Sequence, residues 1–160
     1  MKDSKTELLV MQGLVAGLYA ALTWALPALA FGPIQFRLAE VMTLLAFYNK
    51  KFIPGLTVGC AIANILSPFG IYDILFGTLA SLLALILMSR TRNLFLASLM
   101  PALMSPIIGL VILLTSTEPV AFFLITGQIM ISEILVVTVL GIPFFKILLQ
   151  NHKINHYVAK

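Results

Sequence analysis

The chain has 160 residues, of which 61% are hydrophobic and only 10% are charged, whereas soluble domains carry roughly one-quarter charged residues. This composition predicts an integral membrane protein. The formal net charge of +4 does not indicate a nucleic-acid-binding protein, because the lysines and arginines fall in short connectors. Cys60 is the single cysteine, which excludes an internal disulfide and a cysteine-based metal site.

Polar residues divide the chain into six apolar segments, and each segment predicts a helix. The predicted helices are residues 8–30, 36–48, 52–66, 71–88, 94–114 and 120–149. A helix needs about 20 residues to cross a bilayer, so the second and third are short. Short segments of this kind tilt little, begin in a re-entrant loop or are flanked by protein rather than lipid. We predict an all-α integral membrane fold, a six-transmembrane-helix bundle, in a single domain over residues 1–160.

The first apolar segment has two features of a secretory signal. Lys2 and Lys5 precede it, and Ala28-Leu29-Ala30 mimics a small-residue cleavage site. The segment is much longer than the about 7–15 residues of a secretory hydrophobic region. We therefore interpret it as the first membrane span.

Basic residues recur at alternate connectors. With six spans, one side of the membrane carries most of them, namely Lys2, Lys5, Lys50, Lys51, Arg90, Arg92, Lys146, Lys153 and Lys160. The other side carries Arg37, Asp73 and Glu118. The three outer connectors are residues 27–35, 67–72 and 116–119. By the positive-inside rule both termini are predicted to be cytoplasmic, and the polar residues at the outer helix ends predict a small pocket that opens outward.

Residues 31–40 (FGPIQFRLAE) place an arginine and a carboxylate three positions apart beside long apolar runs. An ionisable side chain in apolar surroundings is costly and marks a pathway or a ligand site. Arg37 and Glu40 share a helix face, so they either neutralise one another or present a cation and a carboxylate to a polar ligand. Gln35 adds an amide that both donates and accepts hydrogen bonds.

Four further polar residues are candidate ligand contacts. Asp73 begins a span and either caps that helix or contacts the ligand. Asn64 lies deep in an apolar run, where an interhelical hydrogen bond and a ligand contact are equal alternatives. Glu133 lies about mid-span without a nearby basic residue in sequence, so it is protonated or meets Arg37 or a bound cation in space. Gln128 points about 140° away from Glu133 on the same helix and is the weaker candidate.

Three aromatic residues and two histidines have two interpretations each. Trp24, Phe69 and Tyr72 either stack on a flat ligand or anchor the protein at the membrane interface. His152 and His156 are spaced one helical turn apart, as metal ligands are, but they lie in a polar tail without a second ligand cluster. We predict a solvated tail and no metal site.

The first span carries small residues at four-residue spacing, in the pairs Gly13/Gly17, Ala16/Ala20, Gly17/Ala21 and Ala21/Ala25. Small residues at this spacing let two helix backbones approach closely in lipid. They either pack inside this protein or form a docking face for another membrane subunit.

Four ordered blocks of the sequence resemble the queuosine-precursor transporter family. The blocks are AGLYAALT at residues 16–23, GPIQFRLAE at 32–40, PGLTVGCAIAN at 54–64 and SPFGIYDILFGTLA at 67–80. Ser132-Glu133 followed by LGIP at residues 140–143 is similar to the last helix of that family. The resemblance covers most of the chain, and the four blocks in order are more specific than any one of them.

The resemblance implies the substrate-binding S component of an energy-coupling factor (ECF) transporter in the bacterial plasma membrane. Such a six-helix bundle captures a 7-deazaguanine compound, such as preQ1, from outside. It docks on a transmembrane scaffold (T) subunit and two cytoplasmic ATPases, commonly through an AxxxA face on the first helix, which Ala16 and Ala20 fill here. Residues 27–35 would form a gate over the ligand. The connector at residues 48–51 is more basic than the family pattern, which bears on membrane contact or docking.

The candidate residues are chemically compatible with a deazaguanine. Its N–H/NH₂ edge suits a carboxylate such as Glu40, Asp73 or Glu133, and its carbonyl suits Arg37 or an amide. Its flat face suits an aromatic ring, and a cationic aminomethyl group would be matched by a further carboxylate.

Two other classes of function are alternatives. The first is a self-sufficient carrier or channel that dimerises through the first helix, and it would copurify only with itself. The second is an intramembrane enzyme that uses Glu40 and Glu133, which is weaker because no nucleophile or metal cluster accompanies them. The sequence has no phosphate-binding loop, so ATP hydrolysis falls to partner subunits. We predict no catalytic residue, metal or cofactor.

Overall fold

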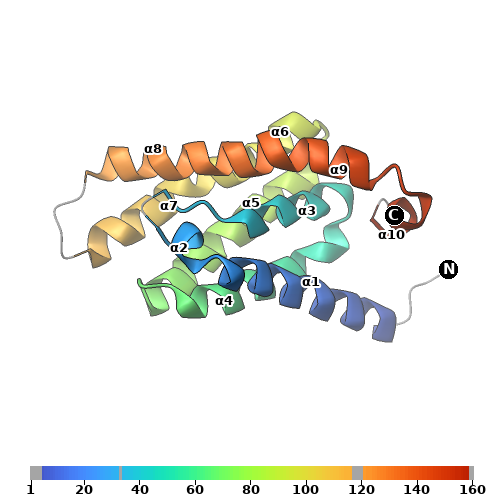
Figure 1. The fold of residues 1–160 in the computed structure, drawn as a ribbon, viewed down its shortest axis with the longest axis horizontal. Helices are drawn as coiled ribbons and strands as arrows, with labels where there is room; N and C mark the ends of the chain where they lie inside the picture. Colours follow the sequence, from blue (N-terminus) through green and yellow to red (C-terminus); the bar gives the residue numbers. More distant parts are fainter. Residues whose placement is uncertain (1–4, 33, 117–120, 159–160) are drawn as a thin grey trace.

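The computed structural model describes residues 5–32, 34–116 and 121–158, and this part of the chain is helical and has no strand (Figure 1). Its elements are α1 (Lys5–Ala25), α2 (Pro27–Ala30), η1 (Leu38–Leu44), α3 (Leu45–Tyr48), η2 (Lys50–Phe52), α4 (Ile53–Ala63), η3 (Asn64–Leu66), η4 (Asp73–Gly77), α5 (Thr78–Arg90), α6 (Leu94–Ser98), α7 (Met100–Thr115), α8 (Phe122–Glu133), η5 (Ile134–Gly141), α9 (Ile142–Leu148) and α10 (His152–Val158). The all-α prediction is confirmed.

Four helical segments are long and apolar enough to cross a membrane. They are Lys5–Ala25, Asp73–Arg90, Leu94–Thr115 and Phe122–Leu148. These correspond to the first, fourth, fifth and sixth predicted helices. The sixth was predicted to begin at Val120, which lies outside the described residues.

The first predicted helix ends earlier than residue 30. α1 stops at Ala25, and Leu26 has φ −134° and ψ 60° before Pro27 begins the short helix α2. The ring of a proline disfavours the helical conformation of the residue that precedes it. The Leu26–Pro27 step therefore separates the membrane span from the connector.

The second predicted helix is surrounded by protein. Its apolar helical part, Leu38–Tyr48, is too short to count as a span, and Ala39, Leu44 and Ala46 are at most 1% exposed. Figure 1 shows this segment between α1 on one side and α8 and α9 on the other, and η1 contacts both α1 and η5. It begins after an extended stretch instead of at Phe36. Of the three explanations for its short length, flanking by protein is the one that this burial supports.

α1 and α4 pack at very close range. Gly59 on α4 faces α1 so closely that a Cβ atom there would lie 2.9 Å from both the Ala16 Cα and the Tyr19 Cβ. One turn earlier, the Gly55 amide donates to the Gln12 side chain, whose amide in turn donates to the Lys51 carbonyl. The glycines of α4 and the small residues of α1 thus let the two backbones meet.

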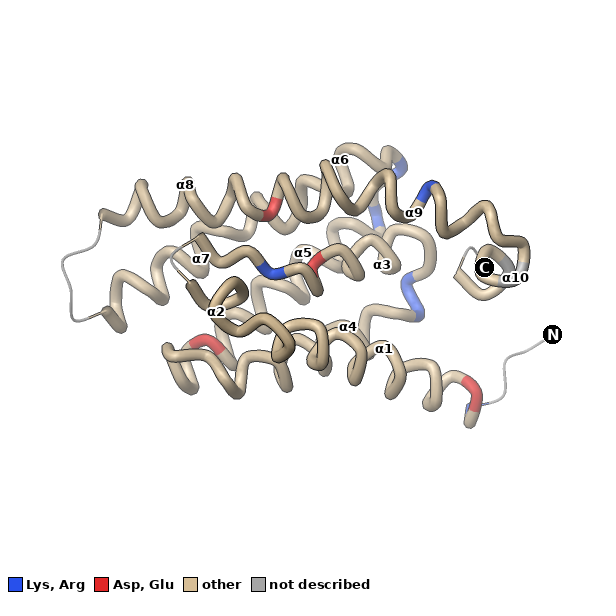
Figure 2. The backbone as a smooth tube through the Cα atoms, in the orientation of Figure 1, with Lys and Arg blue, Asp and Glu red and all other residues tan. Residues whose placement is uncertain are grey.

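The outer surface of the bundle is apolar. Leu14, Leu114 and Phe123 are 70%, 75% and 87% exposed, and Figure 2 shows charged residues as isolated positions on otherwise uncharged helices. Contiguous exposed apolar surface of this extent is unfavourable in water. Lipid contact accounts for it.

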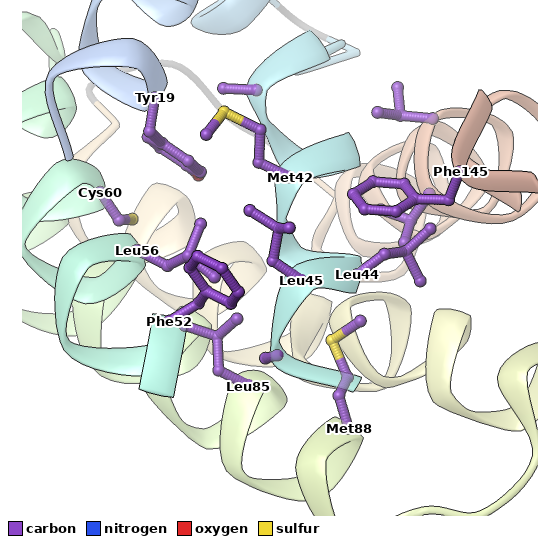
Figure 3. Close-up of a cluster of buried hydrophobic side chains, with 14 of the residues drawn as sticks. Tyr19, Met42, Leu44, Leu45, Phe52, Leu56, Cys60, Leu85, Met88 and Phe145 are labelled. Atoms are coloured by element: carbon purple, nitrogen blue, oxygen red, sulfur yellow. The ribbon is translucent and has the colours of Figure 1, made fainter. Parts of the chain in front are cut away.

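The core lies around the central segment. Figure 3 shows Tyr19, Leu45, Phe52 and Leu85 converging from four different elements. A smaller cluster of Ile112, Ile125 and Ile129 joins α7 to α8.

The tail differs from the prediction of a solvated segment. Residues 152–158 form α10, in which Val158 is buried and Ile154 packs against the main core. The apolar residues of the tail are thus part of the fold, while His152 is exposed. The side chain of His156 lies outside the described part of the structure.

Replacing Gly59 with alanine should destabilise the protein, because the added methyl group would collide with the α1 backbone. Overpacking of this kind costs about 1–3 kcal/mol. Thermal unfolding of the detergent-solubilised protein measures the loss. Gly17→Ala is the matched control, since a Cβ at Gly17 meets nothing within 4 Å. Equal unfolding temperatures for the two variants would contradict the close α1–α4 packing.

Candidate functional site

The extended stretch before η1 carries two candidate residues into the interior. Gln35 has φ 51°, and it is the one non-glycine residue with positive φ in the described chain. Its carbonyl accepts a 3.1 Å hydrogen bond from the Ser132 hydroxyl on α8. A left-handed conformation costs roughly 1–2 kcal/mol for such a residue, and this tether helps to hold it. Gln35 and Arg37 are consequently buried, at 5% and 8% exposed.

A buried network of three side chains holds the central carboxylate. The Tyr19 hydroxyl on α1 donates a 2.5 Å hydrogen bond to Glu40 Oε1, and Arg37 Nη1 lies 3.9 Å from the same oxygen. The Arg37 Cζ also lies 5.4 Å from the centre of the Phe31 ring, a cation–π contact. The pairing of Arg37 with Glu40, one of the two alternatives for these residues, is therefore present, and Tyr19 reinforces it.

A small cavity opens beside this network. Its lining is Gln35, Arg37, Glu40, Gly77, Ala80, Ser81, Ala84, Pro101, Met104, Ser105, Ile108, Ile129 and Glu133. Gln35, Arg37, Glu40 and Glu133, four of the residues singled out from the sequence, thus meet at one cavity. Glu133 lies close enough to Glu40 and Arg37 for their charges to interact.

Several polar atoms at the cavity have no hydrogen-bond partner in the described protein. They include Gln35 Nε2, Ser105 Oγ and Glu133 Oε2. Buried polar groups in proteins are normally paired, and each unpaired one needs an explanation. One amide donor, one hydroxyl and one carboxyl oxygen at the same cavity are what a polar ligand would satisfy.

Asn64 and Asp73 do not line the cavity, but both lie beside Gly77, which does. The Asn64 side-chain amide donates to the Asp73 backbone carbonyl at 3.1 Å and to Cys60 Sγ at 3.6 Å. Of its two interpretations, the interhelical hydrogen bond is therefore present. Neither Asp73 carboxylate oxygen has a hydrogen-bond partner in the described protein, so this side chain does not cap its helix. Both residues adjoin Gly77, where a Cβ would lie 2.7 Å from Asp73 Oδ1 and 2.9 Å from Asn64 Nδ2.

The other candidates do not line the cavity. Gln128 is half-buried on α8, one position before the lining residue Ile129. Tyr72 is 55% exposed. Phe69 packs on the smaller core cluster, and the Trp24 indole donates to the Ala63 carbonyl at 3.1 Å.

The small residues of α1 divide between two faces. Ala16 and Ala20 are 6% and 4% exposed, and Ala16 contacts α4 at Gly59, so internal packing accounts for this pair. Gly13 and Gly17 are exposed and have open space beside them. Only the second pair is available for contact with another protein in this structure.

Sequence reasoning missed the hydroxyl groups at the site. Tyr19 appears only within the block at residues 16–23, and Ser81 and Ser105 are not among the predicted site residues. Their signal was a polar atom at the centre of an apolar helix, where it needs a partner. Among the described residues no group of three or more His, Cys, Asp or Glu lies together.

A family model described as QueT transporter matches residues 9–150. The queuosine precursor transporter QueT of Lactococcus lactis subsp. cremoris (strain MG1363) is 46% identical over 87 residues, which cover 53% of this chain and 51% of that protein. The chain thus spans about half the length of this curated relative. No solved structure matches it.

Tyr19→Phe should destabilise the protein by about 1–3 kcal/mol, because it removes the donor to a buried carboxylate. The difference is measured as the shift in thermal unfolding in detergent. Tyr72→Phe removes the same hydroxyl from an exposed side chain and should leave the unfolding temperature nearly unchanged. If Tyr19→Phe is as stable as that control, the hydrogen bond to Glu40 does not support the fold.

Proposed function

This chain belongs to the QueT transporter family, and from that premise we propose that it is the substrate-binding S component of an ECF-type importer. It captures a queuosine precursor, a 7-deazaguanine such as preQ1, from outside and delivers it inward, while partner subunits hydrolyse ATP. The observation that carries this proposal is a cavity with buried, unpartnered polar groups inside an apolar helical bundle. A few convergent polar groups among apolar lining residues are typical of a small-molecule site.

The cavity offers complementary groups for the edges of a deazaguanine. The carboxylates of Glu40 and Glu133 suit its N–H and NH₂ donors, since hydrogen bonds to charged acceptors are strong. Arg37 and the free amide of Gln35 suit its carbonyl oxygen. Met104, Ile108 and Ile129 provide apolar contact for the faces of the ring.

The proposed topology has six spans in a single domain with both termini in the cytoplasm. The segments at residues 38–48 and 50–66 are the two short spans of this arrangement. Figure 2 supports it, because the basic residues other than the one in the middle of the bundle lie toward the end where both termini lie. Lys2, Glu118 and Lys160, which also entered the charge argument, lie outside the described residues.

The proposed docking face for the ECF scaffold subunit is the outward side of α1. Gly13, Gly17, Ala21 and Ala25 follow one another at four-residue spacing and are all exposed. This stripe replaces Ala16 and Ala20 as the accessible part of the small-residue pattern. A helix of the scaffold can approach it closely, as small residues permit in lipid. The bundle then delivers the ligand by reorienting as a rigid body.

Calorimetric titration of the purified protein should show tight binding of preQ1 and rejection of guanine. Glu133→Gln should weaken preQ1 binding by at least about tenfold, because it removes a charge-assisted hydrogen bond. Gln128→Ala, on the same helix but outside the cavity lining, is the control and should bind normally. Absence of binding to any deazapurine would remove the substrate assignment.

Copurification tests the docking face. The tagged wild-type protein should bring down a scaffold protein and two ATPases, and Gly17→Leu should lose them while still binding preQ1. Gly127→Leu places the same side chain at another open helical position and should keep the partners. Recovery of the protein with copies of itself alone would favour the self-sufficient carrier.

A further inference from the structure

Asp73 does not itself line the cavity, but its carboxylate lies beside Gly77, a lining residue that has no side chain to separate the two. It is the first residue of η4, and Gly77 at the end of the same turn lines the cavity. A Cβ atom added at Gly77 would lie only 2.7 Å from Asp73 Oδ1, so the carboxylate occupies the space beside this glycine. η4 is a π-helical turn, a local widening that often occurs at functional sites.

Among the described residues, both carboxylate oxygens of Asp73 are buried acceptors without a hydrogen-bond partner. Asp73 is 1% exposed, and neither of its oxygens accepts a hydrogen bond from the described protein. The nearby Asn64 amide nitrogen is directed to the Asp73 backbone carbonyl and to Cys60, and Asn64 Oδ1 is a further unpartnered acceptor. Burying an ionised carboxylate without a partner is strongly unfavourable.

The protein's own cations do not meet this demand. Among the side chains that the structure describes, Arg37 is the only buried basic one. It is engaged with Glu40 and Phe31. One arginine therefore faces three carboxyl groups, those of Glu40, Asp73 and Glu133, and it interacts with Asp73 only electrostatically. The interior has an excess of acceptors, which a positively charged ligand would balance.

We propose that Asp73 and Asn64 form a subsite that binds an alkylammonium group on the ligand, so that the protein selects a charged ligand over a neutral one with the same ring. The three ammonium hydrogens match the two Asp73 oxygens and Asn64 Oδ1. Glu40, Glu133 and Arg37 remain for the ring edges. This subsite deepens the proposed function and rests on it.

Calorimetric titration of the full-length protein with two ligands tests the subsite. The first is preQ1, which carries an aminomethyl group, and the second is 7-methyl-7-deazaguanine, its neutral counterpart. The wild-type protein should bind the aminomethyl ligand at least about tenfold more tightly, as expected for a charge-assisted hydrogen bond. Asp73→Asn should abolish this preference and leave affinity for the methyl ligand nearly unchanged. Glu7→Gln removes the same charge from an exposed site on α1 and should keep the preference.

Each other outcome has a distinct meaning. Equal wild-type affinity for both ligands, or an equal loss of both in Asp73→Asn, overturns the subsite and leaves the proposed function standing. No wild-type binding to either ligand overturns the proposed function itself. If Asp73→Asn does not fold, Gly77→Ala decides, because its methyl group would displace the carboxylate. A selective loss of the aminomethyl preference there supports the subsite, and an unchanged preference overturns it.

Discussion

The rest of the structure depends on how this protein keeps charged groups inside an apolar bundle. Glu40 lies on the most buried helical segment, and its Oε1 is held by the Tyr19 hydroxyl and faced by Arg37. An unpaired carboxylate at that depth would be strongly unfavourable. The network therefore fixes η1 against α1. The cavity lies beside it, where polar atoms such as Glu133 Oε2 have no hydrogen-bond partner in the described protein. Arg37 and Glu40 thus both belong to the buried network and line the cavity.

Close packing of α1 and α4 makes this network possible. The glycines of α4 remove the side chains that would separate the helices, and Tyr19 lies one turn along from Ala16 on the face of α1 that meets α4. Because the backbones nearly touch, the tyrosine can reach across to η1. The two stripes of small residues on α1 thus have different surroundings: one side supports the site, and the other is exposed.

Much of the fold could be predicted from the sequence, because polar residues punctuate it so clearly. The arginine–glutamate spacing indicated a pair or a ligand contact, and the isolated position of Glu133 indicated a protonated group or a partner in space. The sequence could not show which stripe of α1 packs internally, since Ala16 and Gly17 are only about 100° apart on a helix. The packing face of α1 is set by its contact with Gly55 and Gly59 on α4, which are distant in the sequence. The left-handed conformation of Gln35 had no signal either, because glutamine has no preference for it.

The contact between Phe31 and Arg37 has an electrical consequence. A cation held against a ring in a desolvated place contributes about 2 kcal/mol or more, and Phe31 belongs to the connector between the first two helical segments. The position of this connector is thus coupled to the field inside the cavity. This one ring therefore joins the connector to the arginine that lines the cavity.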